Sequence, residues 1–256
     1  ADIRHSFKLF AERVPAQGAI VINGDIENYQ EIIEAAKGKV ITFGHSRGND
    51  YSAGDIQYDD YAHPSFDLYI GGEKKERLTL GVAGEHNVYN ALAGTAVGLQ
   101  LGLSIREIAQ GIASVQTIAG RTNLLHVKGM TVIDDCYNAN PVSMKASIDV
   151  LAHTSGRRIA VLGDMGELGA EEKELHRSIG KAVAASGIDA LFCAGTLAEE
   201  YASEAKANPE CEVHYKKTRE EMTEELLAYV KEGDTVLVKA SHFMEFPKVV
   251  EALTKE

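Results

Sequence analysis

The 256-residue sequence lacks the features that mark several special classes of protein. Its three cysteines (Cys136, Cys193 and Cys211) are an odd number without a C-x-x-C pair, so we expect free thiols in a reducing, cytoplasmic setting. No apolar run approaches the ~18 residues of a membrane-spanning helix. Acidic residues (38) outnumber basic ones (26), and the net charge of −12 argues against a large basic face for nucleic acid.

Motifs of several common catalytic chemistries are missing as well. We find no H-E-x-x-H, no Cys/His cluster with zinc spacing and no G-x-S-x-G elbow, and we predict no metal ligands in this chain. The phosphate loop G-x-x-x-x-G-K-[ST] is also absent, so the chain cannot by itself cradle a triphosphate in the usual way. The N-terminus ADIRHSFKLF does not resemble a signal peptide, and the lack of an initiator Met suggests processing or a fragment.

The composition that remains is globular, with 45% hydrophobic and 25% charged residues over a length that fits two modest domains. From about Arg121 onward, β-branched apolar strands alternate with helices. This order predicts an α/β fold with a mainly parallel sheet and helices on both faces. The earlier part combines a βαβ unit, an antiparallel hairpin with a Gly71-Gly72 turn, and two helices. We place the boundary near 116–120, between domains 1–118 and 119–256.

The predicted elements follow from hydrophobic periodicity and from turn and cap signals. In the first domain we expect strands at 18–24, 39–44, 65–70 and 76–82 and helices at 27–38, 87–101 and 104–114. In the second domain we expect strands at 126–134, 157–165, 188–195, 212–216 and 234–241 and helices at 141–154, 171–186, 196–207, 218–231 and 246–256.

A polar helix face is predicted within GEHNVYNALAG. Asn87, Asn90 and Gly94 fall at i, i+3 and i+7, while Val88 and Leu92 lie on another face. Amides both donate and accept hydrogen bonds, so two of them beside a glycine suit a flat polar ligand such as a purine. The alternative is structural: Asn87 caps the helix and Gly94 permits close helix packing.

The stretch IDDCYNANPVSM places Asp134 and Asp135 at the carboxyl end of a strand, where doubly wound sheets bind their ligands. Asn140 before Pro141 is a helix N-cap signal. We expect Asp135 to be a solvated acid able to hold ribose hydroxyls, and its replacement by Asn to leave the fold intact. Tyr137 could pack on a ring. The alternative is an Asx-rich turn with no ligand.

Two more strand ends carry polar residues. Asp164 follows its strand in LGDMGELG, and Lys239, Ser241 and His242 end the last strand. Because a lysine in a buried strand is rare without a partner, we expect an anionic partner for Lys239 and count it among the substrate-binding residues. The alternative for LGDMGELG is a flexible loop. We expect His176, within a helix, to pack rather than catalyse.

Taken together, these stretches resemble the Mur ligases, the ATP-dependent amide-forming enzymes of peptidoglycan precursor synthesis. The resemblance implies the C-terminal half of a mixed α/β ATPase domain followed by a Rossmann-like C-terminal domain. The family's UDP-sugar-binding domain, phosphate loop and upstream magnesium-binding acid are missing. ATP and Mg²⁺ would therefore be bound largely by a missing upstream part, and this fragment alone would be inactive. The matching stretches, in family order, are Asn23–Asp25, Gly84–Gly94, Gly120-Arg121, IDDCYNANPVSM, LGDMGELG and Lys239–Ser241.

The resemblance also implies roles for single residues. Arg121 near the phosphates and Asp135 near the ribose would be the catalytic residues. Asp164 and Ser241 would face the incoming amino acid or dipeptide. The residues implied to contact or border the nucleotide are Asn87, Asn90, Arg121, Asp135, Tyr137 and Asn140.

Within the family, DDCYNANP and LGDMGELG look like the members that add D-alanyl-D-alanine to a UDP-N-acetylmuramoyl-tripeptide. Two departures keep alternatives open. SFKLF, with Phe7 where many members carry a carbamylated lysine, looks more like the members that add L-alanine. His242 stands where the family usually has arginine. A non-catalytic subunit that works with a separate ATPase is the other alternative. The expected partners are a UDP-muramoyl peptide and the amine, with no nucleic acid and no membrane insertion.

Overall fold

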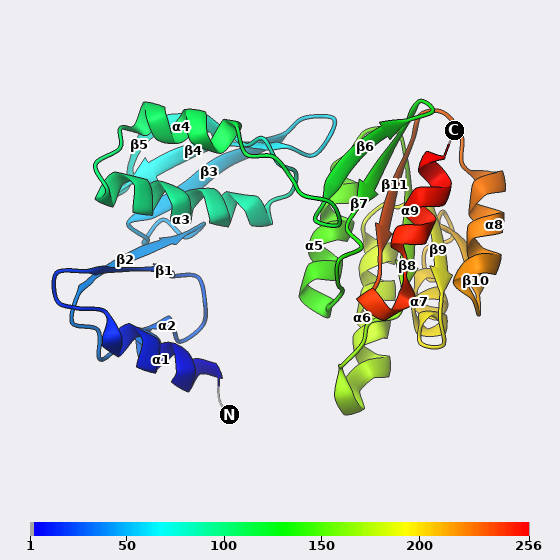
Figure 1. Cartoon of the computed structure of the whole chain (residues 1–256), viewed down its shortest axis with the longest axis horizontal. Helices are drawn as coiled ribbons and strands as arrows, with labels where there is room; N and C mark the ends of the chain where they lie inside the picture. The colour runs from blue at the N-terminus through cyan, green and yellow to red at the C-terminus, as the bar shows by residue number, and fades with distance from the viewer. Residues whose placement is uncertain (1–2, 256) are drawn as a thin grey trace. The chain divides into compact units, whose positions relative to one another are not determined.

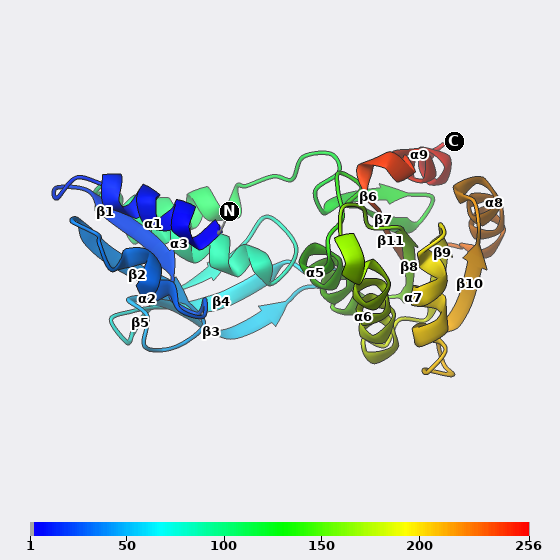
Figure 2. The same cartoon turned by 90° about the horizontal axis from the view of Figure 1, so that it is seen from below.

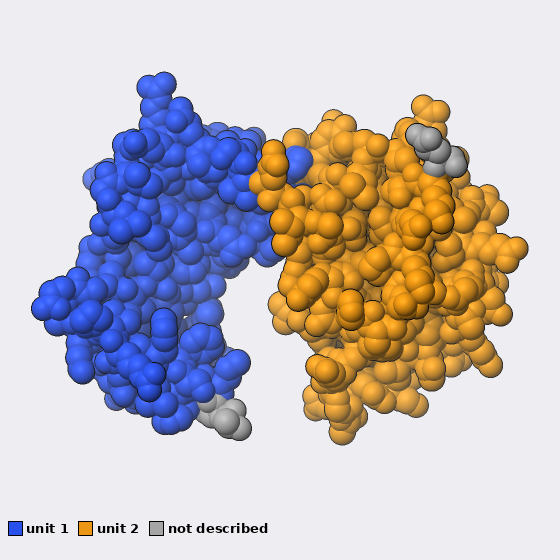
Figure 3. Space-filling view, viewed as in Figure 1, with its two compact units in different colours: residues 1–58, 63–115 blue, residues 59–62, 116–256 orange. Residues whose placement is uncertain are grey.

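The computed structural model describes residues 3–255, which form two compact units (Figure 3). The first unit holds the described residues up to Tyr58 together with His63–Val115. The second holds Asp59–Ala62 together with the described residues from Gln116 onward. The short Asp59–Ala62 segment belongs to the second unit, where the backbone N–H of Ser155 donates to the carbonyl of Asp60 (3.1 Å).

A five-stranded sheet in the order β1-β2-β3-β4-β5 forms the first unit (Figure 1). Neighbours among β1, β2 and β3 run parallel, and β3, β4 and β5 are antiparallel. The predicted hairpin is confirmed, with Gly71 and Gly72 both in the left-handed region (φ 57° and 82°) that glycine adopts without strain. The strands are β1 (Ala19–Asn23), β2 (Lys39–Gly44), β3 (Tyr51–Tyr58), β4 (Pro64–Ile70) and β5 (Glu73–Thr79).

Strand β3 is not among the predicted elements. Its register against β4 shifts between Gly54 and Gln57, and Asp55 adopts a left-handed backbone (φ 48°). Such a bulge breaks the regular alternation on which a sequence-based strand prediction depends.

The helices of the first unit are α1 (Ile3–Arg13), α2 (Tyr29–Ile33), α3 (His86–Gln100) and α4 (Ile105–Ala113). The two predicted helices after the hairpin are confirmed as α3 and α4. Val88, Leu92 and Ala96 of α3 are fully buried against the sheet. The helix predicted over 27–38 is wrong in length, because α2 buries none of its residues and tertiary packing therefore does not extend it.

The second unit contains a six-stranded sheet in the order β10-β9-β8-β11-β7-β6. Its strands are parallel except β6, which is antiparallel to β7. The mainly parallel α/β sheet predicted from the sequence is confirmed. The strands are β6 (Asn123–Val127), β7 (Met130–Asp134), β8 (Arg157–Gly163), β9 (Ala190–Ala194), β10 (Glu212–Lys216) and β11 (Asp234–Lys239).

The single strand predicted over 126–134 is wrong, because the chain reverses there. Lys128 and Gly129 both have positive φ (50° and 71°) and form a tight hairpin turn between β6 and β7. Two left-handed central residues define the turn that best matches the twist of paired strands. Lysine is uncommon in the left-handed region, so the residue types at this turn did not predict it.

Helices cover both faces of this sheet, as predicted. Figures 1 and 2 show α5 (Pro141–Ala152), α6 (Glu172–Ala185) and α7 (Ala198–Ala205) on one face, and α8 (Arg219–Tyr229) and α9 (Pro247–Thr254) on the other. Short 3₁₀ turns, η1 (Gly169–Glu171) and η2 (His242–Met244), precede α6 and α9. The last residue of the predicted final helix, at position 256, lies outside the described residues. None of the described helices has the length and apolar character needed to cross a membrane.

A buried carboxylate in the first unit makes its stability depend on pH. Asp67 of β4 pairs with Lys74 (2.5 Å) and Arg77 (3.0 Å), and its side chain is 6% exposed. The hydrogen bond from Lys74 and a second from Arg77 lower the pKa of Asp67 below its usual 3.8, against the opposing effect of burial. The stability that this pair contributes is therefore present above pH 3.8 and lost as the pH falls through the lowered pKa.

We expect Asp67→Asn to destabilise the first unit at neutral pH and to flatten the decline of its stability below about pH 4. The measurement is urea unfolding between pH 3 and 7, followed by amide exchange in β4 and β5. Asp55→Asn is the control, since Asp55 also pairs with Arg77 (3.1 Å) but has a side chain that is 58% exposed. Parallel pH profiles for Asp67→Asn and the unsubstituted chain would contradict the prediction.

Candidate functional site

Three loops meet at the carboxyl edge of the second unit's sheet, beside β11. Strand β11 lies between β7 and β8, and it leads into α9 on one face, whereas β7 and β8 lead into α5 and α6 on the other (Figures 1 and 2). Chains that leave neighbouring strands toward opposite faces open a crevice, and ligands of such sheets bind there. The predicted residues at this edge are Asp134, Asp135, Asp164, Lys239 and Ser241.

Lys239, at the end of β11, is enclosed by the protein, with 2% of its surface exposed. Its Nζ donates to Oδ2 of Asp135 (2.6 Å) and to the carbonyl of Asn138 (3.0 Å). The anionic partner predicted for Lys239 is therefore Asp135, on the loop that follows β7. A direct contact between Lys239 and substrate stays a prediction.

The expectation that Asp135 is a solvated acid is wrong. The residue is 6% exposed, and its carboxylate accepts three hydrogen bonds inside the protein. Oδ1 accepts from the backbone N–H of Thr122 (3.0 Å), and Oδ2 accepts from the hydroxyl of Ser147 (2.5 Å) as well as from Lys239. Thr122 and Ser147 were not predicted. The sequence feature that could have identified Ser147 as a partner of this loop is its place on α5, one turn after Ser143.

The two adjacent aspartates also hold the segment that carries Arg121. Asp134 accepts from the backbone N–H of Gly120 (2.8 Å), and Asp135 accepts from that of Thr122. Arg121 is thus anchored on both sides, and its guanidinium lies 4.0 Å from the centre of the Tyr137 ring. Arg121 and Tyr137 are both exposed, so this cation–π pair presents a positive charge and an aromatic edge to solvent.

Asn140 is the predicted N-cap of α5. Its Oδ1 accepts from the backbone N–H of Ser143 (2.9 Å), while the Ser143 hydroxyl accepts from the backbone N–H of Asn140 (3.1 Å). Pro141 occupies the first turn, as predicted. A contact of Asn140 with nucleotide stays a prediction, because its side-chain oxygen already caps the helix.

Asp164, after β8, points its carboxylate at the N-terminus of α7. Oδ1 accepts from the backbone N–H of Ala198 (2.7 Å) and Oδ2 from that of Leu197 (3.2 Å), and the residue is 8% exposed. A negative charge is stabilised at a helix N-terminus. Gly195 makes room for this carboxylate, since a Cβ there would overlap it. Asp164 therefore has a structural task, and its predicted contact with the amine stays a prediction.

Ser241 and His176 hold the LGDMGELG loop in one conformation. The Ser241 hydroxyl accepts from the backbone N–H of Gly166 (2.8 Å), and Nε2 of His176 accepts from that of Met165 (3.0 Å). Nδ1 of His176 donates to the carbonyl of Glu172 (2.6 Å), so this fully buried ring is a neutral tautomer. His176 packs, as predicted, and the loop is held rather than flexible.

The surroundings of the thiols near this edge favour the protonated, unreactive form. Burial and the neighbouring Asp134 raise the pKa of Cys136 well above its usual range, and burial raises the pKa of Cys193 to about 12. All three cysteines are free, as predicted, and buried. None is placed to act as a nucleophile, since the thiolate is the reactive form.

The first unit carries a separate groove between α3 and α4, with a volume of about 440 Å³. The predicted face of Asn87, Asn90 and Gly94 lines it. No atom lies within 4 Å of where a Cβ of Gly94 would be, so the glycine keeps the groove open and does not serve close helix packing. The rest of the lining consists of Glu107, two further glycines and apolar side chains: Gly98, Gly111, Leu80, Val82, Ala91, Leu103, Ile108, Ile112 and Val115.

A chain of hydrogen bonds sets the orientation of the two amides. Nδ2 of Asn87 donates to the carbonyl of Ala83 (2.8 Å), and Oδ1 of Asn87 accepts from Nδ2 of Asn90 (2.9 Å). The Oδ1 of Asn90 makes no hydrogen bond within the part of the chain that the structure describes. An apolar groove with one such oriented amide is suited to a planar, partly polar ring. The cap alternative for Asn87 is not supported, because Asn87 lies inside α3 and its side-chain oxygen accepts from the Asn90 amide and not from a backbone N–H of the first turn.

The Asn23–Asp25 stretch, one of the stretches that carry the family resemblance, stabilises the start of α3. The carboxylate of Asp25 accepts from the backbone N–H of His45 (2.5 Å) and from the hydroxyl of Tyr89 (3.3 Å). The His45 ring stacks on that of Tyr89, with 4.4 Å between centres. These contacts fix the helix turn that carries Asn87 and Asn90.

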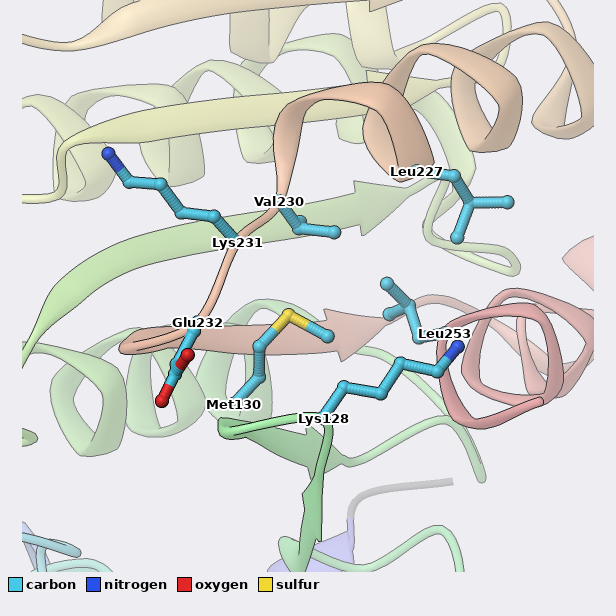
Figure 4. Close-up of a pocket in the computed structure, with 7 residues that line it drawn as sticks. All are labelled: Lys128, Met130, Leu227, Val230, Lys231, Glu232 and Leu253. Carbon is cyan, nitrogen blue, oxygen red and sulfur yellow. The ribbon is translucent and has the colours of Figure 1, made fainter. Parts of the chain in front are cut away.

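Another hollow lies at the opposite, amino edge of the second unit's sheet, and its volume is about 220 Å³ (Figure 4). Met130, Leu227, Val230 and Leu253 form its apolar wall. Figure 4 shows Lys128 extending toward Leu253. None of the predicted site residues lies here. Within residues 3–255, no three His, Cys, Asp or Glu side chains come together in a group that could hold a metal.

Comparison with known protein families identifies the family of this chain. A model of the Mur ligase middle domain matches residues 1–98, and a model of the Mur ligase glutamate ligase domain matches residues 120–242. The chain belongs to the Mur ligase family. The resemblance predicted from the motifs is thereby confirmed.

The similar relatives include ligases of two different substrate specificities. The UDP-N-acetylmuramate–L-alanine ligase of Lachnospira eligens is 40% identical over 163 residues, covering 63% of this chain and 35% of the relative. The UDP-N-acetylmuramoyl-tripeptide–D-alanyl-D-alanine ligase of Escherichia coli is 31% identical over 246 residues, covering 94% of this chain and 53% of the relative. The chain therefore spans about half the length, or less, of these Mur ligases.

Solved Mur ligase structures share the fold of almost the whole chain. MurF from Acinetobacter baumannii superposes with a TM-score of 0.85 at 28% identity, over 98% of this chain and 55% of that one. MurF from Thermotoga maritima, in complex with ADP, has a TM-score of 0.78 at 25% identity, over 93% of this chain and 53% of that one. The mixed α/β middle part and the Rossmann-like second part predicted from the resemblance are confirmed.

The buried pair of Asp135 and Lys239 predicts a stability effect. We expect Asp135→Asn to destabilise the second unit by about 3–5 kcal/mol, since it leaves a buried ammonium without its counter-charge. The double variant Asp135→Asn with Lys239→Met should recover part of that loss, because it removes the stranded charge. Urea unfolding of the two variants and the unsubstituted chain measures the effect. A single variant as stable as the unsubstituted chain would show that the pair contributes nothing.

Proposed function

We propose that this chain forms the adenine-binding and amine-binding parts of an ATP-dependent ligase that adds D-alanyl-D-alanine to a UDP-N-acetylmuramoyl-tripeptide in the cytoplasm. The observation that carries the proposal is the similarity to a D-alanyl-D-alanine ligase over 94% of the chain. The groove beside Asn90 and the buried pair of Asp135 and Lys239 support it. The domain ranges 1–118 and 119–256 belong to this proposal.

The proposed chemistry joins a carboxylate to an amine in two steps. ATP phosphorylates the substrate carboxylate, the amine attacks the acyl phosphate, and inorganic phosphate leaves. The protein's contribution is then to position the reactants and to stabilise developing charge. ATP supplies the activation, and this chain's residues bind and orient it.

The groove between α3 and α4 supports adenine binding. Its apolar walls suit the two faces of a purine, and Oδ1 of Asn90 is free to accept from an exocyclic amino group. The related MurF from Thermotoga maritima is described in complex with ADP. We therefore assign Asn87 the task of orienting Asn90, and Asn90 that of contacting adenine.

The anchored pair of Arg121 and Tyr137 supports phosphate binding. Arg121 is exposed and held from both sides, as a residue that meets phosphate oxygens should be. The carboxylate of Asp135 has about four acceptor positions and three are occupied, so one, on Oδ1, could take a ribose hydroxyl. The main task of Asp135 in this proposal is to position Arg121. Asn140 borders the same loop.

We expect Asn90→Ala to weaken ADP binding to the chain by about tenfold, through loss of one specific hydrogen bond in an apolar groove. Gly94→Leu should abolish binding by filling the groove, and it should not lower the melting temperature, since its Cβ meets open space. Isothermal titration measures the affinity. Gln110→Ala, an exposed amide on α4 outside the groove, is the control. Unchanged affinity in Gly94→Leu would place adenine elsewhere.

We also propose that the 256-residue chain alone does not hydrolyse ATP. It contains no phosphate loop, and transfer needs the β- and γ-phosphates and Mg²⁺ held together. A phosphate-release assay with Mg-ATP should stay at background. Turnover that persists through a second purification step, and disappears in Gly94→Leu, would contradict this.

Two alternatives rest on specific observations. The 40% identity to an L-alanine ligase over 163 residues favours addition of L-alanine. The missing phosphate loop favours a non-catalytic subunit paired with a separate ATPase, and a co-purifying protein with a phosphate loop would support that.

The choice of amine is tested by competition in the complete ligase that contains this chain. We expect D-alanyl-D-alanine to be consumed in preference to L-alanine, each with its UDP-muramoyl acceptor, because the second unit carries the D-alanyl-D-alanine-like motifs. Preferential consumption of L-alanine would overturn this choice and leave the ligase assignment standing.

A further inference from the structure

The incoming amine needs a carboxylate partner, and Asp164 is poorly available for it. Both oxygens of Asp164 accept hydrogen bonds from backbone N–H groups at the start of α7, at 2.7 and 3.2 Å. The residue is only 8% exposed. Turning this carboxylate toward a substrate would leave the helix N-terminus unsatisfied. A different acid on the same loop would not carry that cost.

Glu167, three residues further along, has the properties that Asp164 lacks. It is exposed, and within residues 3–255 its carboxylate makes no hydrogen bond or ion pair. Its backbone is left-handed (φ 62°), which is costly for any residue except glycine and a few small polar ones. A glutamate at this position is explained if its side chain is needed there.

The loop that carries Glu167 is held firmly on its N-terminal side. The backbone N–H groups of Met165 and Gly166 donate to His176 and Ser241. The hydroxyl of Ser241 also donates to the carbonyl of Ala139 (3.4 Å), on the loop after β7. Glu167 is therefore placed at the crevice where the loops after β7, β8 and β11 meet.

An aromatic surface lies beside this acid. Phe243, in η2 after β11, is 62% exposed, and its ring lies against Gly166, where an added Cβ would be 2.9 Å from it. An exposed ring that lies against the residue preceding this acid matches a small amine that carries methyl groups near its ammonium.

We propose that Glu167 binds the ammonium group of the incoming alanyl amine and that Phe243 contacts its methyl groups. In this arrangement Asp164, His176 and Ser241 are positioning residues that set the loop. The inference rests on the proposed function, because it names the residue that meets the amine in that same site.

The test is a titration of the 256-residue chain with D-alanyl-D-alanine, followed by amide NMR shifts, with N-acetyl-D-alanyl-D-alanine as the probe without an ammonium. We expect shifts at 166–169 with the free dipeptide and at least about tenfold weaker binding of the acetylated one. Glu167→Gln should show the same weakening. Glu171→Gln, an exposed acid four residues on, should bind as the unsubstituted chain does.

Glu167→Gly distinguishes the effect of the carboxylate on binding from the effect of the left-handed backbone on stability. It removes the carboxylate and relieves the left-handed backbone, so we expect weaker binding of the dipeptide with an equal or higher melting temperature. Phe243→Ala should weaken both dipeptides alike, because it removes apolar contact and no charge.

Equal affinity of Glu167→Gln and the unsubstituted chain, equal affinity for the two dipeptides, or no shift with either would each overturn the proposal. ADP added to the same samples distinguishes this from failure of the proposed function. Shifts at Asn87 and Asn90 with ADP would leave the adenine site standing, whereas their absence would count against the proposed function itself.

Discussion

The second unit depends on one ion pair that is buried at the carboxyl edge of its sheet. Lys239 and Asp135 are 104 residues apart in the sequence and 2.6 Å apart in the fold. Enclosing both charges costs several kcal/mol of hydration, which the short contact and additional hydrogen bonds offset. Those additional bonds come from Thr122 and Ser147, so the pair joins the last strand, the loop after β7, helix α5 and the start of the unit.

Most of the acids in the family motifs are turned inward by the fold. Asp134 and Asp135 hold the backbone on either side of Arg121, and Asp164 holds the start of α7. A carboxylate that accepts backbone N–H groups fixes a loop more tightly than apolar packing does, because its hydrogen bonds are charge-assisted and directional. The groups that face solvent include the stacked Arg121 and Tyr137, and Glu167. The buried acids thus fix the backbone of the loops that carry the exposed residues.

The first unit uses another means to present polar groups. Its two groove amides are oriented by hydrogen bonds that run from Ala83, just before α3, through Asn87 to Asn90. The first turn of that helix is braced through its own Tyr89, which contacts Asp25 and His45 from neighbouring loops. The oriented amides and apolar walls fit a ligand recognised by shape and by amide hydrogen bonds.

The sequence by itself determined the order of most strands and helices, the cap at Asn140 and the glycine turn after β4, because these depend on residues a few positions apart. It also determined that Asp135, Asp164 and Lys239 meet at one edge, since parallel strands share their carboxyl ends. Only the tertiary structure decided which of these groups reach solvent. The burial of Asp135 requires Lys239, the occupation of Asp164 requires the start of α7, and the hairpin at Lys128 and Gly129 requires β7 as a partner. Each of these outcomes is a balance between hydration and contacts with distant parts of the chain, and local pattern carries no information about that balance.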